Sequence, residues 1–223
     1  MHIDRVTNPE DVRQIHLELI EESFPPDEKT STDVFVDAVN SGNTILYGAK
    51  LEGRWAGEVA LEVYDERDFA LISWLSTAEH SRGRGLGGKL LQLAIDEGTR
   101  LGAKWLIGEI EDPATPVTSV AHGNPASRAQ FYARHGAKAL LLDYQQPPIG
   151  PGKNALDMLL IAFSKEPLPA ALPSEPLGRF LHSYVGDHEA TWQRLEPGLN
   201  SAEVELIDLN SEAFSRSRLS GRN

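Results

Sequence analysis

The chain has 223 residues, a length that fits one or two domains and allows a substantial buried core. Its net charge is −12, and the first 40 residues hold ten acidic side chains against three basic ones. This acidity argues against a broad basic face for nucleic-acid phosphates. The absence of cysteine excludes disulfides, thiolate metal sites and cysteine nucleophiles.

The chain shows no basic-then-apolar leader and no run of 18 apolar residues. From this we expect a soluble protein with no membrane partner, and the lack of a secretory signal peptide favours the cytoplasm.

The first half of the chain predicts a strand, two helices and three further strands. Residues 2–6 form the strand. A helix starts after Asn8, with Pro9 at its first position, and runs to Phe24. A short helix over 32–39 precedes strands over 44–51, 55–64 and 69–77. The short turn at 52–54 indicates an antiparallel hairpin.

The pattern changes after residue 80. We expect a helix over 86–101, a strand over 104–111, a helix over 124–135, and two strands over 137–142 and 155–163. A loop rich in proline and glycine separates the last two strands. The order predicts a mixed α/β fold (α+β mixed sheet), with an antiparallel N-terminal half and one βαβ crossover.

Residues 1–165 are expected to form one domain, and residues 166–223 an extension of it. The extension begins with a proline-rich strap and continues as a helix over 176–195 and a polar tail. It holds few large apolar side chains, so an independent core is not expected. It is expected to pack on the main domain or on a second subunit, which leaves a homodimer open.

A glycine-rich segment precedes the helix at 86–101 and fits three sequence patterns. Its residues are Arg82, Gly83, Arg84, Gly85, Leu86, Gly87, Gly88, Lys89 and Leu90. The phosphate loop of nucleotide hydrolases needs a hydroxyl where Leu90 stands. A dinucleotide fingerprint should follow its strand at once and needs more βαβ units. A loop for the pyrophosphate of acyl-CoA fits best, because glycines open backbone N–H groups toward an anion at a helix N-terminus.

At this point the sequence resembles the GNAT superfamily of N-acetyltransferases. The resemblance covers about residues 1–165 and rests on three stretches in the right order. They are the strand end Leu75-Ser76-Thr77 with its glycine loop, the strand around Ile107-Gly108-Glu109-Ile110, and the helix from Asn124 to Gly136 with Tyr132.

The resemblance implies a sheet whose central strands splay apart, and acetyl-CoA as the co-substrate. The main chain of the strand end would face the pantetheine arm, and the glycine loop would hold the pyrophosphate. The implied cofactor-binding residues are Leu75, Thr77, Arg82, Gly83, Arg84, Gly85, Leu86, Gly87, Gly88 and Asn124. One strand amide would polarise the thioester carbonyl.

The resemblance also implies direct attack of a primary amine on the thioester. Tyr132 would protonate the departing thiolate; the less favoured alternative is that it only packs beside Phe131. Glu109 is the best candidate for the general base, with Glu58 and Glu62 as rivals on an earlier strand. Any one of these glutamates could instead be a solvated charge.

The segment 111–123 is longer than in typical members of the superfamily and would shape the acceptor site. His122 within it could act as a base or contact the substrate, or be an ordinary loop histidine. The other histidines form no cluster of ligands, so no metal site is expected. Trp74 and the other strand tryptophans are expected in the core or in a pocket wall.

Three functions remain open. The first is an enzyme that acetylates a small-molecule or peptide amine. The second is an acyl-CoA-binding or sensing module without catalysis, and the third a nicotinamide-dependent oxidoreductase. The acidic N-terminal segment would favour a cationic acceptor, unless it is only a solvated surface.

Overall fold

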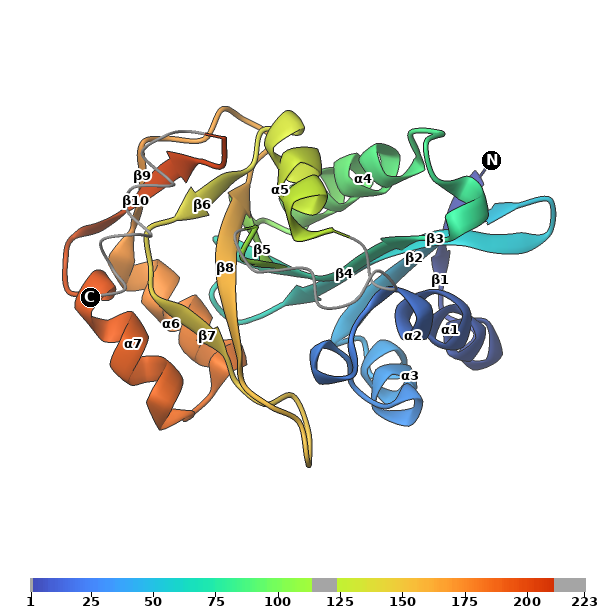
Figure 1. Ribbon diagram of the computed structural model, residues 1–223, viewed down its shortest axis with the longest axis horizontal. Helices are drawn as coiled ribbons and strands as arrows, with labels where there is room; N and C mark the ends of the chain where they lie inside the picture. The colour runs from blue at the N-terminus through green and yellow to red at the C-terminus, as the bar shows by residue number, and fades with distance from the viewer. Residues whose placement is uncertain (1, 114–123, 211–223) are drawn as a thin grey trace.

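A computed structural model describes residues 2–113 and 124–210 (Figure 1). One mixed sheet runs through the molecule in the order β1-β2-β3-β4-β5-β8-β6-β10-β9, and β7 pairs with β8. The strands are β1 (His2–Val6), β2 (Thr44–Leu51), β3 (Arg54–Val63), β4 (Phe69–Thr77), β5 (Trp105–Glu111), β6 (Lys138–Leu140), β7 (Tyr144–Gln146), β8 (Leu156–Phe163), β9 (Ala171–Pro173) and β10 (Glu203–Asp208).

Seven α-helices cover this sheet. They are α1 (Pro9–Ile15), α2 (Glu21–Ser23), α3 (Thr32–Asn40), α4 (Leu86–Arg100), α5 (Pro125–Arg134), α6 (Ser174–Val185) and α7 (Glu189–Leu199), within the described ranges. A π-helical turn, His16–Ile20, joins α1 to α2, and short 3₁₀ turns cover Pro26–Glu28 and Glu79–Ser81. The mixed α/β fold expected from the sequence is confirmed.

The first four strands form an antiparallel half, as predicted. β1 to β4 pair antiparallel in sequence order. The β2–β3 hairpin closes through Glu52 and Gly53, both with positive φ, which suits the right-handed twist of paired strands. The single βαβ crossover follows: β4 and β5 are parallel and α4 connects them.

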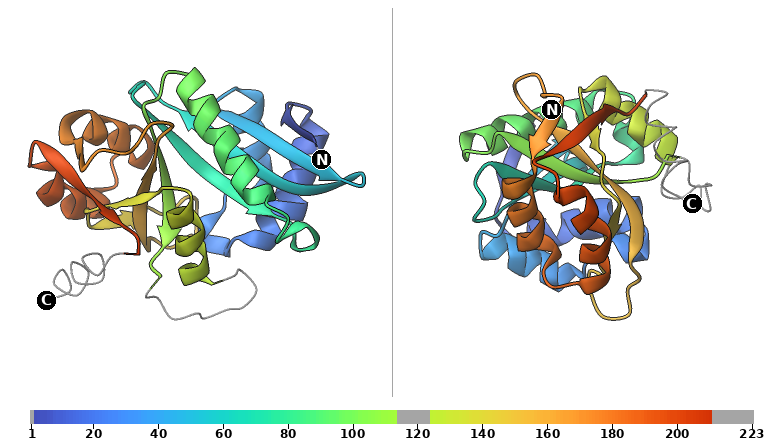
Figure 2. Two further views of the ribbon diagram at one scale, coloured as in Figure 1. Left: turned by 90° about the horizontal axis from the view of Figure 1, so that it is seen from above. Right: turned by 90° about the vertical axis from the view of Figure 1, so that its left-hand side faces the viewer.

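Three groups of helices divide the two faces of the sheet. Helices α4 and α5 pack on one face (Figures 1 and 2). Helices α1 to α3 cover the N-terminal part of the other face, and α6 and α7 cover its C-terminal part. Each group has its own cluster of buried apolar side chains. The gap between the second and third groups is therefore bounded by elements from opposite ends of the chain.

The C-terminal extension differs from the expected single helix and polar tail. The helix divides into α6 and α7 at Gly186, whose positive φ ends α6. Residues Glu203–Asp208, expected in the tail, form strand β10 between β6 and β9. Val204 and Leu206 alternate with exposed positions and are buried, a two-residue period that marks a strand.

The extension shares a hydrophobic core with the main sheet. Leu177, Phe180 and Leu181 of α6 are fully buried, and the Phe180 ring stacks on Phe69 of β4 at 5.3 Å between centroids. The same cluster includes Tyr144 and Leu160. These contacts hold α6 against strands β4, β5 and β8.

Strands β4 and β5 separate after their first four residues. Their pairing covers Phe69–Ile72 against Trp105–Gly108 and then ends. A bulge at Ser73 shifts the register between β3 and β4 at this point, because Ala60 faces Trp74 whereas Leu61 faces Ile72. The rest of β4 stays on β3, while the rest of β5 stays on β8. A wedge opens between them, which confirms the expected splay.

Candidate active site

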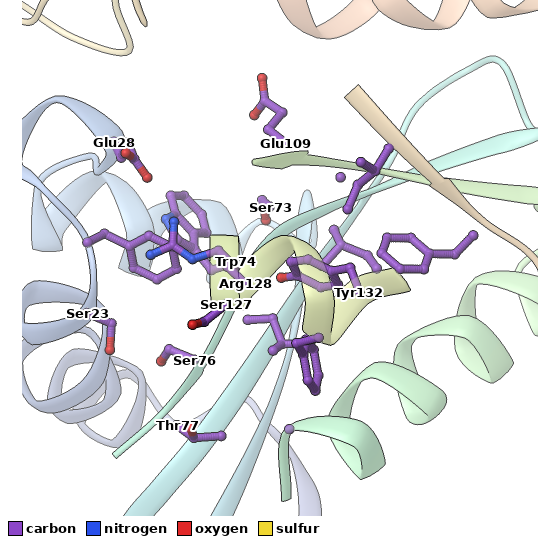
Figure 3. A pocket seen from close by; sticks show the side chains of 18 of the residues that line it. Ser23, Glu28, Ser73, Trp74, Ser76, Thr77, Glu109, Ser127, Arg128 and Tyr132 are labelled. Carbon is purple, nitrogen blue, oxygen red and sulfur yellow. The ribbon is translucent and has the colours of Figure 1, made fainter. Parts of the chain in front are cut away.

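The wedge between β4 and β5 holds a cavity of about 370 Å³, the transfer cavity (Figure 3). Its walls come from β4, β5, the start of α4, the α5 helix, β8 and the segment after α2. The lining residues are Ser23, Phe24, Glu28, Ile72, Ser73, Trp74, Leu75, Ser76, Thr77, Arg82, Gly87, Gly108, Glu109, Asn124, Ser127, Arg128, Phe131, Tyr132, Ile161 and Phe163.

The open edge of β4 presents backbone groups to the transfer cavity. Ala78 N–H donates to Ala56 O on β3 at 2.9 Å, so the pair 56/78 is a hydrogen-bonded pair of the ladder. Such pairs alternate along antiparallel strands, so Ser76 also faces β3. The N–H groups of Leu75 and Thr77 consequently point toward the wedge. These are the two amides assigned to pantetheine by the resemblance.

The glycine loop borders one end of the transfer cavity, where Arg82 and Gly87 line it. Gly83 and Gly85 have φ of +75° and +74°, a left-handed backbone that other residues rarely adopt. Gly85 is the N-cap residue of α4, and the N–H groups of the first helical turn have no acceptor within the helix. Arg82 contacts Thr77 O through Nε at 3.4 Å. This arrangement suits an anion such as a pyrophosphate.

Gly87 and Gly88 allow α5 to approach α4 closely. A Cβ on Gly88 would lie 2.7 Å from His135 Nε2, and one on Gly87 would lie 3.4 Å from the Phe131 ring. The side chain of Leu86 is buried beneath the loop, so only its main chain can face a ligand. These residues therefore also set the distance between the two helices that frame the site.

Tyr132 lies on α5 at the inner end of the transfer cavity. Its ring packs edge to face against Phe131 and Phe163, with centroids 5.1 and 5.5 Å away. Figure 3 shows its hydroxyl pointing into the cavity. Burial raises the pKa of Tyr132 to about 12, so the phenol keeps its proton at neutral pH. The ring thus packs beside Phe131, as one of the two alternatives from the sequence expected, and its hydroxyl still faces the cavity, where a ligand can reach it.

Asn124 caps α5, as its position before Pro125 predicted. Its Oδ1 accepts hydrogen bonds from the N–H groups of Ala126 and Ser127 at 2.8 and 3.3 Å. The residue also lines the transfer cavity. One helical turn later, Arg128 reaches across to β5, where its Nη1 lies 2.8 Å from Glu111 Oε2. This ion pair ties α5 to the strand that carries Glu109.

Glu109 lies where β5 leaves β4, at the border of the transfer cavity. Its two oxygens accept hydrogen bonds from the Tyr144 hydroxyl and from Gln146 Nε2, the latter at 3.1 Å. Burial raises its pKa, and these two donors offset part of the rise. Figure 3 shows the carboxylate pointing away from Tyr132.

The rival glutamates occupy different environments. Glu58 is completely buried in the sheet, opposite Ser76, and does not line the transfer cavity. Glu62 lies further along β3 and accepts a hydrogen bond from the Tyr64 hydroxyl at 2.5 Å. His122 lies outside the described residues.

Glu28 is a cavity residue that sequence reasoning missed. It follows the Pro25-Pro26 break after α2 and lines the transfer cavity from the side opposite α5. Burial, with repulsion from Glu111, raises its pKa to about 7. Local sequence gave no signal for it, because its place in the site depends on how the segment between α2 and α3 folds over the wedge. Arg128 and Ser127 were also missed, although both lie on the predicted helix that carries Tyr132.

Comparison with known proteins agrees with this geometry. Residues 10–136, more than half of the chain, match the acetyltransferase (GNAT) family. The chain belongs to the GNAT family. Among curated proteins, none matches the chain.

Solved structures of the GNAT family share the fold. A protein described as a GNAT-family acetyltransferase from Bacteroides thetaiotaomicron has a TM-score of 0.62 at 22% identity, over 83% of this chain and 98% of that one. A protein described as an acetyltransferase from Salmonella typhimurium, with its cofactor acetyl-CoA, has a TM-score of 0.52 at 18% identity, over 76% and 96%. An aminoglycoside 6′-acetyltransferase has a TM-score of 0.52 at 17% identity, over 76% and 100%.

Membership of the acetyltransferase (GNAT) family agrees with acetyl-CoA as the expected co-substrate. The chain's own residues fit it: two free amides on β4 lead to a positively charged glycine loop with two left-handed glycines. Over the described part of the chain, no three His, Asp or Glu side chains group as metal ligands. In that part, no helix is long and apolar enough to cross a membrane.

Proposed function

We propose that this protein transfers the acetyl group of acetyl-CoA to a primary amine. The observation that carries the proposal is the wedge, where the free edge of β4 and the Tyr132 hydroxyl face one cavity that opens onto the glycine loop. In this assignment the cofactor-binding residues are Leu75, Thr77, Asn124 and the loop from Arg82 to Gly88.

The reaction proceeds by direct attack. The amine nitrogen adds to the thioester carbonyl carbon, and the amide of Leu75 or Thr77 stabilises the negative charge on the carbonyl oxygen. The C–S bond then breaks and leaves CoA as a thiolate. Tyr132 donates its proton to that sulfur, which is a suitable role for a phenol that remains protonated at neutral pH.

A carboxylate must accept the proton that the amine loses. The sequence assigns this role to Glu109, and its orientation away from Tyr132 implies transfer through a water molecule. Glu28 is a second candidate, because its carboxyl group lines the transfer cavity and has a pKa of about 7, close to the ideal for a base at neutral pH. Their separate replacement by glutamine distinguishes them.

The acceptor is proposed to be cationic. The acidic N-terminal segment contributes Glu28 to the cavity wall, and its carboxylate attracts a protonated amine on the side away from Arg82. The likeness in fold to an aminoglycoside acetyltransferase is consistent with an amine acceptor, although it fixes no substrate.

The test is release of CoA thiol from acetyl-CoA in the presence of a panel of primary amines. The chain has no cysteine, so a thiol reagent detects only CoA. Amine-dependent release above the rate with water, together with the acetylated amine in the mass spectrum, supports the proposal. Tight binding of acetyl-CoA without transfer to any amine supports instead an acyl-CoA-binding module.

A further inference from the structure

A second cavity, the distal chamber, adjoins the transfer cavity on the side away from the glycine loop. It has a volume of about 200 Å³ and shares Glu28, Ser73, Trp74 and Glu109 with the transfer cavity. Its far walls come from the end of β3, from β7 and from α6 of the C-terminal extension. It thus lies in the gap between the two helix groups on one face of the sheet.

The walls of the distal chamber are acidic. Glu28, Glu62 and Glu109 line it, and among its described lining residues none is Lys, Arg or His. Neutral donors hold two of the carboxylates: the Tyr64 hydroxyl bonds to Glu62, and Tyr144 and Gln146 bond to Glu109. For Glu109, the two hydrogen bonds offset only part of the rise in pKa that burial causes. Arg128, which does not line the chamber, offsets part of the charge of Glu28. Partly buried carboxylates such as these three attract a cation.

Tyr184 of α6 gives an independent indication of a ligand. Its hydroxyl is buried, and its contact with the Tyr144 hydroxyl falls outside hydrogen-bond geometry. Its ring lies among aromatic neighbours, with centroids 6.1 Å from Tyr64 and 5.5 Å from Phe180. A buried hydroxyl without a well-formed hydrogen bond destabilises the fold unless a ligand or water supplies one. Aromatic faces also attract organic cations.

We propose that the distal chamber binds a second, compact cationic group of the acceptor, and that Tyr184 makes the chain selective for amines carrying such a group. This inference rests on the proposed acetylation of an amine. The reacting amine occupies the transfer cavity, and the remote cation contacts Glu62 and the Tyr184 hydroxyl.

The proposal also gives the C-terminal extension a role. Leu177, Phe180 and Leu181 fix α6 in the core, so the Tyr184 ring is held at the chamber wall. Tyr144 and Tyr184 both lie beyond residue 136, where the match to the family ends. The extension therefore adds a specificity element to the fold shared with the family.

The experiment compares diamines with monoamines of equal length. kcat/KM is measured for 1,4-diaminobutane against 1-aminobutane, and for the homologous pairs with two to six carbons. Wild type should prefer at least one diamine by about 10- to 100-fold, because a hydrogen bond to a charged group has that effect on affinity. Tyr184→Phe and Glu62→Gln should each lower this preference about tenfold, with little change for the monoamine.

Tyr47→Phe is the matched control, because it removes a tyrosine hydroxyl on β2 that lines neither cavity. It should leave the preference unchanged. Tyr184→Phe keeps the ring that packs on Phe180, so it removes the hydroxyl without creating a cavity in the chamber wall.

Calorimetric titration of the same amines into the protein with CoA separates this inference from the proposed function. Diamine binding that weakens in Tyr184→Phe and Glu62→Gln supports the chamber even if no amine is acetylated. Acetylation with equal kcat/KM for diamines and monoamines overturns the proposed role of the chamber and leaves the proposed function intact. Absence of diamine binding in the titration also overturns the chamber, whatever the activity.

Discussion

The stability of the fold should depend on pH through Glu58. This carboxyl group lies on β3 and is completely buried, and neither oxygen meets hydrogen-bond geometry with any described residue. Burial raises its pKa from 4.5 to about 8, and nearby Ser76 offsets only part of the rise. Glu58 is therefore neutral in the folded protein at pH 7 and ionised in the unfolded chain.

The size of the effect follows from these two values. Between pH 4.5 and 8 the unfolded chain releases a proton that the folded chain keeps, so the free energy of unfolding falls as pH rises. The slope approaches 1.4 kcal/mol per pH unit, and the loss reaches about 3 kcal/mol by pH 7. Below pH 4.5 the group is protonated in both states and the effect vanishes.

Glu58→Gln removes this titration while keeping the size of the side chain. We expect the free energy of unfolding of the variant, relative to wild type, to rise by about 3 kcal/mol between pH 4.5 and pH 7. Urea unfolding followed by tryptophan fluorescence at four or five pH values measures the difference. The comparison across pH cancels any constant cost of burying an amide.

Glu18→Gln is the control, because Glu18 is exposed on the π-helical turn. Its unfolding free energy should follow that of wild type at every pH. The reasoning about Glu58 would be refuted by parallel curves for Glu58→Gln and wild type, which would mean that the buried group titrates near its ordinary value.

Four further outcomes are expected. Tyr132→Phe should lower kcat by about 10²- to 10⁴-fold and leave acetyl-CoA binding by calorimetry unchanged, whereas an unchanged kcat would remove its acid role. If Glu28 is the base, kcat/KM should rise with pH through an apparent pKa near 7, and Glu28→Gln should abolish this rise whereas Glu109→Gln should not. Loss of the rise in Glu109→Gln instead would identify Glu109 as the base. Gly85→Ala should weaken acetyl-CoA binding about tenfold, because φ is +74° there, while Gly53→Ala, at φ +81° in the β2–β3 hairpin, should strain the backbone without affecting that binding. Phe180→Ala should lower the free energy of unfolding by about 3–5 kcal/mol in denaturant titrations, and a change below 1 kcal/mol would mean that α6 does not share the core.

Local patterns in the sequence determined the elements that form the central part of the fold. The strands at 44–51 and 69–77 were predicted at the bounds of β2 and β4, and α4 and α5 to within one residue. Each of these has its signal in neighbouring residues: apolar periodicity, an Asn cap, or glycines at a turn. The first helix was predicted as continuous, but the π-helical turn interrupts it where His16, Leu19 and Ile20 pack against the sheet.

The C-terminal extension was the least predictable part, although its signals were present. Gly186 marked the end of α6, and the alternation at 203–208 marked a strand. What the sequence did not show was that β10 inserts between β6 and β9, because strand order depends on packing between distant segments.

The sequence alone predicted a loop for acyl-CoA and, further along the chain, a helix with a tyrosine, because each of these stretches is contiguous and the chemistry of the loop lies largely in the backbone. Only the tertiary structure decided which residues surround the proposed acceptor site. Glu28, Glu109 and Tyr184 are far apart along the chain, and they meet because the wedge in the sheet is covered from one side by the segment after α2 and from the other by α6. Burial in that gap, and not the identity of the residues, sets the pKa of the two glutamates and leaves the tyrosine hydroxyl facing the chamber.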